Sequence, residues 1–230
     1  MIRSKIIIVG GGIGGLAAAL ALAQKTFDVI VLEQASHFKE VGAGIQLGPN
    51  VFKMFKALNL IEPVEELAVF PNALVMRDAL TAKEITRIPI NTASFKKQFR
   101  FPYGVIYRPD LLNILKQACD RLPNINIIFN KRVVKTEQTP TKAFVICEDH
   151  TSHEAQAVIG ADGLWSEIRK NILGSEAPRV SGHIAYRAVL PIDDVPEGSR
   201  NNEVTLWAGP KTHLVQYPLH RGEIMNLVAV

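Results

Sequence analysis

The stretch Ile6-Ile-Ile-Val-Gly-Gly-Gly-Ile-Gly-Gly15 decides the fold of this 230-residue chain. Its first four residues form a short apolar run, which is typical of a strand buried on both faces. The glycines satisfy Gly-x-Gly-x-x-Gly, and strong helix formers follow at residues 16–24. A second strand is expected at residues 28–33, with apolar residues at positions 29–32. Strand, turn, helix and strand thus succeed one another within about thirty residues. This order predicts a Rossmann-like βαβ unit that binds an adenine dinucleotide.

Each part of this motif has a physical task. Gly10 permits the sharp turn, Gly12 lets the backbone approach a pyrophosphate, and Gly15 allows the helix to pack closely on the strand. The N–H groups and partial positive charge at the helix N-terminus favour phosphates. Glu33 ends the second strand, where its carboxylate can accept hydrogen bonds from a ribose diol and disfavours a 2′-phosphate. The motif alone does not distinguish FAD from NAD.

Charge and cysteine content narrow the class of protein. The formal net charge of +4 is scattered, and no basic stripe or nucleic-acid motif accompanies it, so nucleic acid is not expected as a partner. Cys119 and Cys147 have no ligand-like spacing and are expected to be buried core residues of a protein from a reducing compartment. His150 and His153 lack suitably placed partner ligands, so no metal site is expected. With no signal peptide and no apolar stretch of about 20 residues, we expect a cytoplasmic enzyme without a membrane span.

The rest of the chain predicts an α/β protein with a second, sheet-rich part. Strand-like runs and two longer helices, at residues 51–60 and 109–121, continue to residue 175, and a further short helix is expected to be capped by Ser166 and closed by Gly174. Residues 42–48 and 91–102 are expected to be loops. After Pro178, strand-like runs are separated by Pro, Gly, Asp and Asn, which favours an antiparallel sheet. We therefore expect a dinucleotide-binding domain at residues 1–175, with residues 72–104 contributing strands to a substrate domain that occupies residues 176–230.

Three further segments carry a resemblance to a known family. They are residues 42–50 (Gly-Ala-Gly-Ile-Gln-Leu-Gly-Pro-Asn), residues 107–112 (Tyr-Arg-Pro-Asp-Leu-Leu) and residues 160–169 (Gly-Ala-Asp-Gly-Leu-Trp-Ser-Glu-Ile-Arg). In this order, and together with the glycine motif, they resemble the FAD-dependent monooxygenases that hydroxylate aromatic rings. The nearest resemblance is to the 3-hydroxybenzoate 6-hydroxylase and salicylate hydroxylase group. The family fold is a Rossmann-like FAD-binding domain of the GR2 type joined to an antiparallel-sheet substrate domain, here partial.

The resemblance implies FAD-binding roles for the residues that match the family motifs. The glycine motif and Glu33 should hold the ADP half of FAD, Val133 should line the adenine, and Arg108 should lie near the phosphates. Gln46 should lie near the ribityl chain or the ring system of FAD. Asp162 should contribute both to binding FAD and to the interaction with the nicotinamide co-substrate. The complete set of expected cofactor-binding residues is Gly12, Gly14, Gly15, Glu33, Gln46, Arg108, Val133 and Asp162. For three of these residues an interpretation without a cofactor stays open. Arg108 could be a surface arginine at a helix start, Gln46 an ordinary loop residue, and Asp162 an aspartate that only stabilises a turn.

The resemblance also implies an activity. FAD, reduced by NADH or NADPH, would use molecular oxygen to hydroxylate a phenolic or aromatic carboxylic acid, and the full-length enzyme could be a homodimer. His213 is the candidate base, and Tyr217, four residues on in the same strand-like run, should share its face and bind a carboxylate or a phenol. A structural histidine and an ordinary half-buried tyrosine remain the alternatives. Arg187 is interpreted as an inter-domain salt-bridge residue or, less favoured, as a nicotinamide phosphate contact.

One departure from the family bears on activity. The family has a Gly-Asp motif well after residues 160–169, whose aspartate holds the ribityl chain, and this sequence contains no Gly-Asp dipeptide. The sequence also stops within the apolar run 224–230, so we expect it to be a shortened form of such an enzyme. The main alternative is therefore a truncated, inactive FAD-binding remnant. A different FAD enzyme on the same scaffold, and an NAD dehydrogenase, are weaker alternatives.

Overall fold

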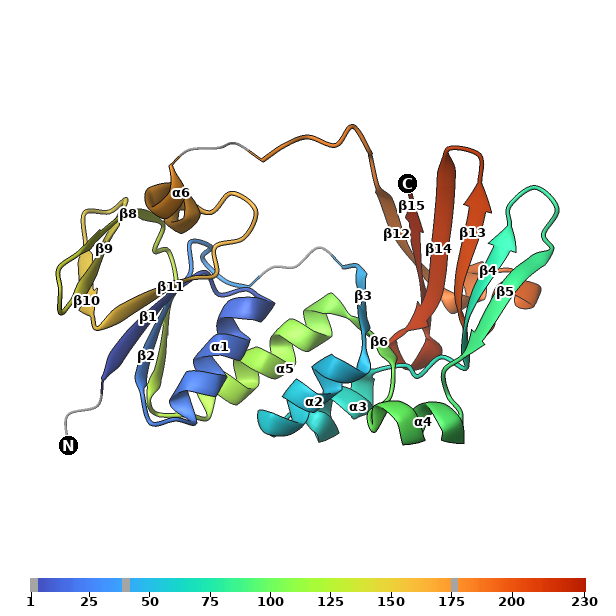
Figure 1. The fold of residues 1–230 in the computed structure, drawn as a ribbon, viewed down its shortest axis with the longest axis horizontal. Coiled ribbons are helices and arrows are strands. Elements are labelled where there is room, and N and C mark those ends of the chain that lie inside the picture. Colours follow the sequence, from blue (N-terminus) through green and yellow to red (C-terminus); the bar gives the residue numbers. More distant parts are fainter. Residues whose placement is uncertain (1–3, 39–41, 175–177) are drawn as a thin grey trace. The chain divides into compact units, whose positions relative to one another are not determined.

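The computed structural model describes residues 4–38, 42–174 and 178–230 (Figure 1). Contacts divide the chain into two compact units, and each is made of two separate segments. The first unit comprises Met1–Lys39 and Leu112–Val180, and the second comprises Glu40–Leu111 and Ser181–Val230. The functional division expected from the sequence, at residue 175, stays a prediction.

A four-stranded parallel sheet is the centre of the first unit. Its order is β11-β1-β2-β7, with every neighbouring pair parallel. The strands are β11 (Ala157–Gly160), β1 (Lys5–Val9), β2 (Asp28–Leu32) and β7 (Ile125–Ile128). Ile7 and Ile8 are fully buried because β1 has a neighbour on each side and a layer on each face. The α/β class with a Rossmann-like unit is confirmed.

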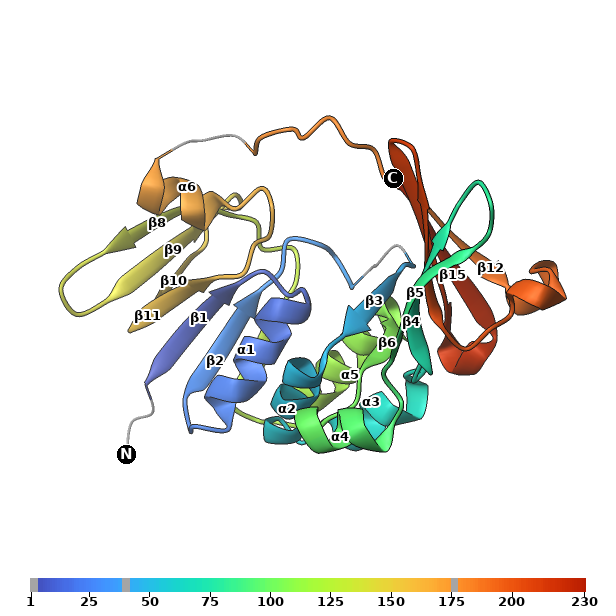
Figure 2. The same ribbon diagram turned by 45° about the vertical axis from the view of Figure 1, so that its right-hand side comes forward.

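Helices cover one face of this sheet and a second sheet covers the other (Figures 1 and 2). Helix α1 (Ile13–Ala23) and helix α5 (Arg108–Asp120) lie together on one face, where the Cys119 thiol contacts the Leu16 carbonyl oxygen at 3.6 Å. The other face packs on a three-stranded antiparallel sheet, through a core that includes Ile7, Val9, Leu32, Val133, Val145, Cys147 and Ala155. That sheet consists of β8 (Val133–Gln138), β9 (Ala143–Cys147) and β10 (Ser152–Ala155), and α6 (Glu167–Leu173) packs beside it.

The second unit is built on a six-stranded sheet of order β12-β15-β14-β13-β4-β5. Its strands are β12 (Tyr186–Pro191), β15 (Ile224–Ala229), β14 (Thr212–Leu219), β13 (Val204–Gly209), β4 (Ala73–Asp78) and β5 (Glu84–Pro89). Four of the five pairings are antiparallel, as expected, but β13 and β4 pair in parallel. Parallel pairing is possible here because more than a hundred residues of chain connect β4 to β13, whereas a tight turn would allow only antiparallel pairing.

Smaller elements complete the second unit. Strands β3 (Gly44–Leu47) and β6 (Gly104–Tyr107) form an antiparallel pair. The helices are α2 (Pro49–Ala57), α3 (Ile61–Leu67) and α4 (Ala93–Phe99), and three 3₁₀ turns are η1 (Ile192–Asp194), η2 (Glu197–Ser199) and η3 (His220–Gly222). Val105, Val204, Tyr217 and Leu219 form a buried cluster where β6 meets the large sheet. No helix among the described residues is both long enough and apolar enough to span a membrane.

Two local expectations were wrong, and one helix was not predicted. Residues 42–48 contain strand β3 rather than only a loop, because β6 supplies a pairing partner distant in sequence. Residues 91–102 contain α4, which Thr92 caps by accepting a hydrogen bond from the Phe95 N–H at 3.2 Å. Helix α3 was not predicted, since Pro63 obscures it, although a proline is tolerated in a first helical turn.

Gly15 provides a test of how closely α1 packs. A Cβ added at Gly15 would lie under 3.0 Å from the Gly10 carbonyl oxygen, whereas one added at Gly14 would meet no heavy atom within 4 Å. We expect Gly15→Ala to lower the free energy of unfolding by about 1–3 kcal/mol, the usual cost of overpacking. Gly14→Ala is the matched control and should be neutral or stabilising by up to about 1 kcal/mol. Urea unfolding of the flavin-free protein measures both, and equal effects of the two substitutions would contradict the interpretation.

Candidate functional site

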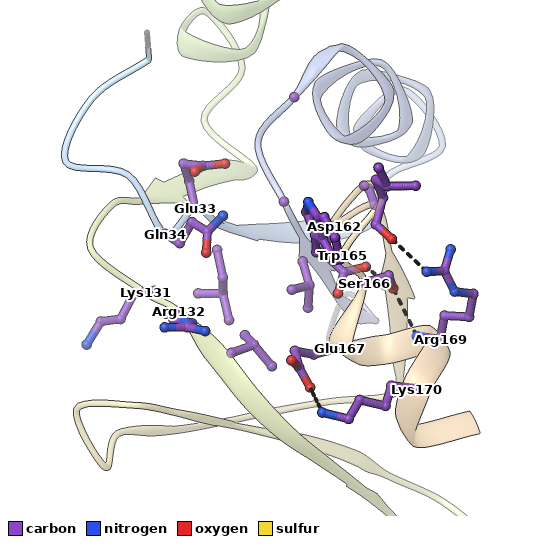
Figure 3. A pocket seen from close by; sticks show the side chains of 18 of the residues that line it. Glu33, Gln34, Lys131, Arg132, Asp162, Trp165, Ser166, Glu167, Arg169 and Lys170 are labelled. Atoms are coloured by element: carbon purple, nitrogen blue, oxygen red, sulfur yellow. Dashed lines mark hydrogen bonds and ion pairs between the residues drawn. The ribbon is translucent and has the colours of Figure 1, made fainter. Parts of the chain in front are cut away.

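A pocket of about 880 Å³ opens at the carboxyl ends of the parallel strands of the first unit (Figure 3). Its wall comes from the ends of β1 and β2, the start of β8, and the turn between β11 and α6. Ligands of open α/β sheets bind at this edge, where the chain leaves the strands. The volume lies within the range of roughly 300–1,000 Å³ found for small-molecule and cofactor sites.

The glycine motif shapes one wall of this pocket. Gly10 has a positive φ of 102°, and a Cβ there would lie under 3.0 Å from the backbone of Ala161. Gly12 is the N-cap of α1, lines the pocket, and would present an added Cβ to open space. The backbone at Gly12 is therefore accessible to a phosphate group. Gly14 and Gly15 do not line the pocket, and Gly15 instead provides the close contact between α1 and the turn.

Glu33 forms the acidic wall. Its Oε2 accepts a hydrogen bond from the Gly11 N–H at 2.7 Å, and its Oε1 accepts one from the Ala35 N–H at 2.9 Å. These two bonds hold the carboxylate at the pocket edge and leave each oxygen a further lone pair. The arrangement can therefore accept two more hydrogen bonds, as a ribose diol requires.

Asp162 has a structural task in the turn before α6. Its Oδ1 accepts a hydrogen bond from the Ser166 hydroxyl at 2.5 Å, and its Oδ2 accepts one from the Ile168 N–H at 3.0 Å. Ser166 in turn caps α6 by accepting from the Arg169 N–H at 2.9 Å, as the sequence predicted (Figure 3). Asp162 also lines the pocket, so the turn role and a ligand role are compatible. The ligand role stays a prediction.

Several residues line the pocket although the sequence analysis gave them no role in a cofactor site. Lys131, Arg132, Arg169 and Lys170 bring positive charge to the lining, which suits phosphate groups. Arg169 and the 75% exposed Trp165 stand within the motif at residues 160–169, yet their side chains were given no role. The motif was a sufficient signal for both. Val133, which was expected to line an adenine, is buried and does line the pocket.

Gln46 and Arg108, the other two expected cofactor residues, belong to the second unit. The Gln46 side-chain oxygen, on β3, accepts a hydrogen bond from the Tyr103 hydroxyl. The backbone N–H of Arg108, where α5 begins, donates a hydrogen bond to the Ala43 carbonyl oxygen at 3.0 Å. Their contacts with FAD stay predictions.

His213 and Tyr217 lie on one face of β14, as strand alternation requires. His213 is half-buried and its backbone pairs with Val230, whereas Tyr217 is only 3% exposed and belongs to the core cluster. A Cβ added at Gly44 would lie under 3.0 Å from the Tyr217 ring, so strand β3 passes directly beside this ring. Within the second unit, the candidate substrate strand therefore contacts the strand that carries Gln46.

Asn226 is a buried polar residue that the sequence reading missed. It lies opposite Tyr217 in the β14–β15 pairing, and its Oδ1 accepts a hydrogen bond from the Gly44 N–H at 2.8 Å. Its Nδ2 is buried without a hydrogen-bond partner among the described residues. The available signal was a single polar residue inside the apolar run 224–230. Tyr217 and Asn226 thus hold β3 against the large sheet.

Burial controls the ionisation of Tyr217. Removal from water raises the pKa of the Tyr217 phenol to about 12, and the Tyr103 phenol adds to this rise. The guanidinium of Arg187 acts in the opposite direction and lowers the pKa. Tyr217 is therefore a neutral hydrogen-bonding group at physiological pH rather than a base.

The comparisons with known proteins decide the family. The FAD binding domain model matches residues 3–207. The chain belongs to the FAD-binding domain family. It is 42% identical to 3-hydroxybenzoate 6-hydroxylase 1 of Aquipseudomonas alcaligenes over 98% of its own length and 57% of the relative's. Identity to the 3-hydroxybenzoate 6-hydroxylase of Polaromonas naphthalenivorans is also 42%, over 97% and 55% of the two chains. The chain thus spans little more than half the length of these curated relatives.

Solved structures confirm the fold class. Klebsiella pneumoniae HpxO complexed with FAD and uric acid superposes with a TM-score of 0.87 at 24% identity, covering 99% of this chain and 56% of that one. The tetrameric form of 2-methyl-3-hydroxypyridine-5-carboxylic acid oxygenase gives a TM-score of 0.84 at 21% identity, covering 100% and 59%. The resemblance stated from the sequence, to FAD-dependent aromatic hydroxylases, is confirmed by the family match and by these relatives.

Glu33→Gln tests the acidic wall. The amide keeps only one acceptor oxygen, and its NH₂ group faces an N–H donor, so both the ribose contact and the local turn are weakened. We expect the Kd for FAD to rise by about 10-fold or more, as loss of a charge-assisted hydrogen bond implies. Titration with FAD, followed by quenching of flavin fluorescence, measures the Kd. Glu65→Gln, at an exposed position of α3, is the control, and an unchanged Kd for Glu33→Gln would contradict the assignment.

Tyr217→Phe tests the burial of the phenol. In the unfolded chain a tyrosine has a pKa of about 10, whereas burial raises the pKa of Tyr217 to about 12 in the folded protein. Between these pH values the unfolded chain loses the proton and the folded chain keeps it, so the free energy of unfolding falls as pH rises. Tyr217→Phe should flatten this decline in urea unfolding at pH 9, 10 and 11. The 71% exposed Tyr186 provides the control, Tyr186→Phe, and an identical decline in wild type and Tyr217→Phe would show that the phenol is not shielded.

Proposed function

We propose that this chain provides the FAD-binding part and the first substrate-binding sheet of an NADH- or NADPH-dependent monooxygenase that hydroxylates a phenolic or aromatic carboxylic acid. The observation that carries the proposal is the 42% identity to 3-hydroxybenzoate 6-hydroxylases, which extends over both units. The proposed substrate is therefore 3-hydroxybenzoate or a close relative.

The residues of the pocket fit the cofactor. Gly12 offers an open backbone to the pyrophosphate, Glu33 keeps lone pairs for the ribose, and Val133 gives an apolar wall for the adenine. Gln46 and Arg108 are proposed to complete FAD binding from the second unit. FAD, when bound, supplies the redox chemistry: it takes electrons from the nicotinamide and activates oxygen.

The proposed role of the second unit is to bind the aromatic ring and to prepare it for oxidation. A phenol has a pKa of about 10 and is mostly neutral at pH 7, while its phenolate is far more electron-rich. His213 is proposed to accept the phenolic proton through its imidazole. The Tyr217 hydroxyl, which is neutral at this pH, is proposed to donate a hydrogen bond to the substrate.

The remaining partners follow from this chemistry. A small aromatic acid, molecular oxygen and NADH or NADPH are the proposed reactants, and a homodimer is the proposed state of the full-length enzyme. A cytoplasmic location is proposed because reduced nicotinamide is available there. The buried, unpaired Cys119 and Cys147 are compatible with a reducing compartment.

Two measurements on the purified 230-residue chain test the proposal. The first is binding of FAD, and the second is NADH or NADPH oxidation stimulated by 3-hydroxybenzoate with formation of a dihydroxybenzoate, detected by liquid chromatography. Binding with turnover supports the whole proposal. Binding without turnover favours the alternative, an inactive FAD-binding remnant, and absence of FAD binding would overturn both.

His213→Ala tests the base. Loss of general-base catalysis typically slows a reaction by about 10²–10⁴-fold, so we expect a loss of hydroxylation in this range while the Kd for FAD is unchanged. The reaction of the variant should recover as pH approaches the pKa of the free phenol, because solvent then removes the proton. His183→Ala, at an exposed position, is the control and should keep the wild-type pH profile. A His213→Ala variant with the wild-type rate and pH profile would refute the role.

A further inference from the structure

Within the second unit, the pairing register of β12, β15 and β14 places four polar side chains of these strands on one face of the large sheet. Arg187 on β12 pairs with Val228 on β15, and Val228 pairs with Val215 on β14. Directly paired residues share a face, and so do residues two apart in one strand. Residues Arg187, Val189, Asn226, Val228, His213, Val215 and Tyr217 therefore all occupy the same face. Tyr217 packs against Gly44 from this face.

Arg187 is the cation of this face. Val228 and Val215 follow Arg187 across the sheet, and in the neighbouring row Val189 and Asn226 precede Tyr217. The other titratable groups of these strands on this face are His213 and Tyr217, while Tyr103 lies near Tyr217 from the side of β6. None of these is a carboxylate, and the carboxylate that the register does place on this face is Asp78 on β4, two strands from His213. Asp78 Oδ1 accepts hydrogen bonds from the Leu80 and Thr81 N–H groups, at 2.9 and 2.7 Å. Within the described residues, no hydrogen bond or ion pair joins Arg187 to another side chain, and the residue is exposed. An accessible guanidinium beside an apolar surface is suited to an anionic aromatic ligand.

The spacing of the strands and the charge of Arg187 both suit an aromatic anion that lies on this face. Two strand spacings of about 4.8 Å separate the backbones of Arg187 and Val215, which a long arginine side chain and a benzene ring together can bridge. The guanidinium also lowers the pKa of the Tyr217 phenol against the effect of burial, so its field reaches this hydroxyl. A ring lying on the valines could thus direct one substituent to Arg187 and another to His213 or Tyr217.

We propose that Arg187 is the specificity-determining residue of the substrate site, and that it binds the carboxylate of a hydroxybenzoate whose phenol is directed to His213 and Tyr217. This inference rests on the proposed function and deepens it. It replaces the sequence interpretation of Arg187 as an inter-domain or nicotinamide contact with a role toward the aromatic acid. A planar guanidinium can form two parallel hydrogen bonds with a carboxylate, which an ammonium group cannot do.

The test compares a charged ligand with its neutral isostere. Isothermal titration calorimetry of the FAD-loaded 230-residue chain measures the Kd for 3-hydroxybenzoate and for 3-hydroxybenzamide. We expect Arg187→Gln to raise the Kd for 3-hydroxybenzoate by about 10- to 100-fold, as loss of a charge-assisted bidentate pair implies. The Kd for 3-hydroxybenzamide should stay within about two-fold. Arg187→Lys should recover part of the affinity for the acid but none of the bidentate geometry.

Controls separate the possible outcomes. Arg121→Gln removes an exposed cation of the first unit and should leave both Kd values unchanged. Equal weakening of both ligands by Arg187→Gln, or no change in either, would overturn the role of Arg187 while the proposed function stands. A change confined to the Kd for NADH or NADPH would also overturn it and would restore the nicotinamide interpretation. Absence of 3-hydroxybenzoate binding by the wild-type chain, with FAD bound, would refute the substrate of the proposed function and this inference together.

Discussion

The close approach of α1 to the first turn is the constraint on which the cofactor site depends. Gly15 has no side chain, so the helix backbone can lie directly against the Gly10 carbonyl, and Gly10 itself needs a positive φ. This contact fixes the direction in which the N–H groups at the start of α1 point. Gly11 then lies within hydrogen-bonding distance of Glu33, so the acidic wall and the helix terminus become one rigid feature. A phosphate-binding surface and a ribose-binding carboxylate are thus set by a few backbone contacts.

The sequence was most informative where a motif constrains the backbone. The strand at residues 6–9, the turn at Gly10–Gly15, the Ser166 cap and the acidic residue at position 33 were all predictable, because each depends on local chemistry. Strand β3 could not be predicted from residues 42–48, since its partner β6 is some sixty residues away in sequence. The parallel pairing of β13 with β4 is likewise a non-local choice that periodicity cannot reveal.

The candidate site residues also divide into those set by a local motif and those set by non-local strand pairing. Glu33 and Asp162 stand at motif positions, and their surroundings in the structure suit the expected chemistry. Asn226 and Arg187 carry no motif, and their interest comes only from the register of β12, β15 and β14. The role of a polar residue in an apolar run can be inferred only when its neighbours across the sheet are known. The sequence therefore predicted residues of the pocket in the first unit more completely than the polar residues on the large sheet of the second unit.

The order of strands in the parallel sheet has a consequence for synthesis of the chain. Strand β1 lies between β2 and β11, but β11 is more than a hundred residues downstream. While the chain emerges from the ribosome, one edge of the apolar strand Lys5–Val9 must stay without its partner until residues 157–160 are made. Unpaired strand edges of this kind are prone to association with other chains. The time taken to synthesise residues 33–156 is therefore the period in which this strand edge is open to association, and slower translation of that stretch would lengthen it.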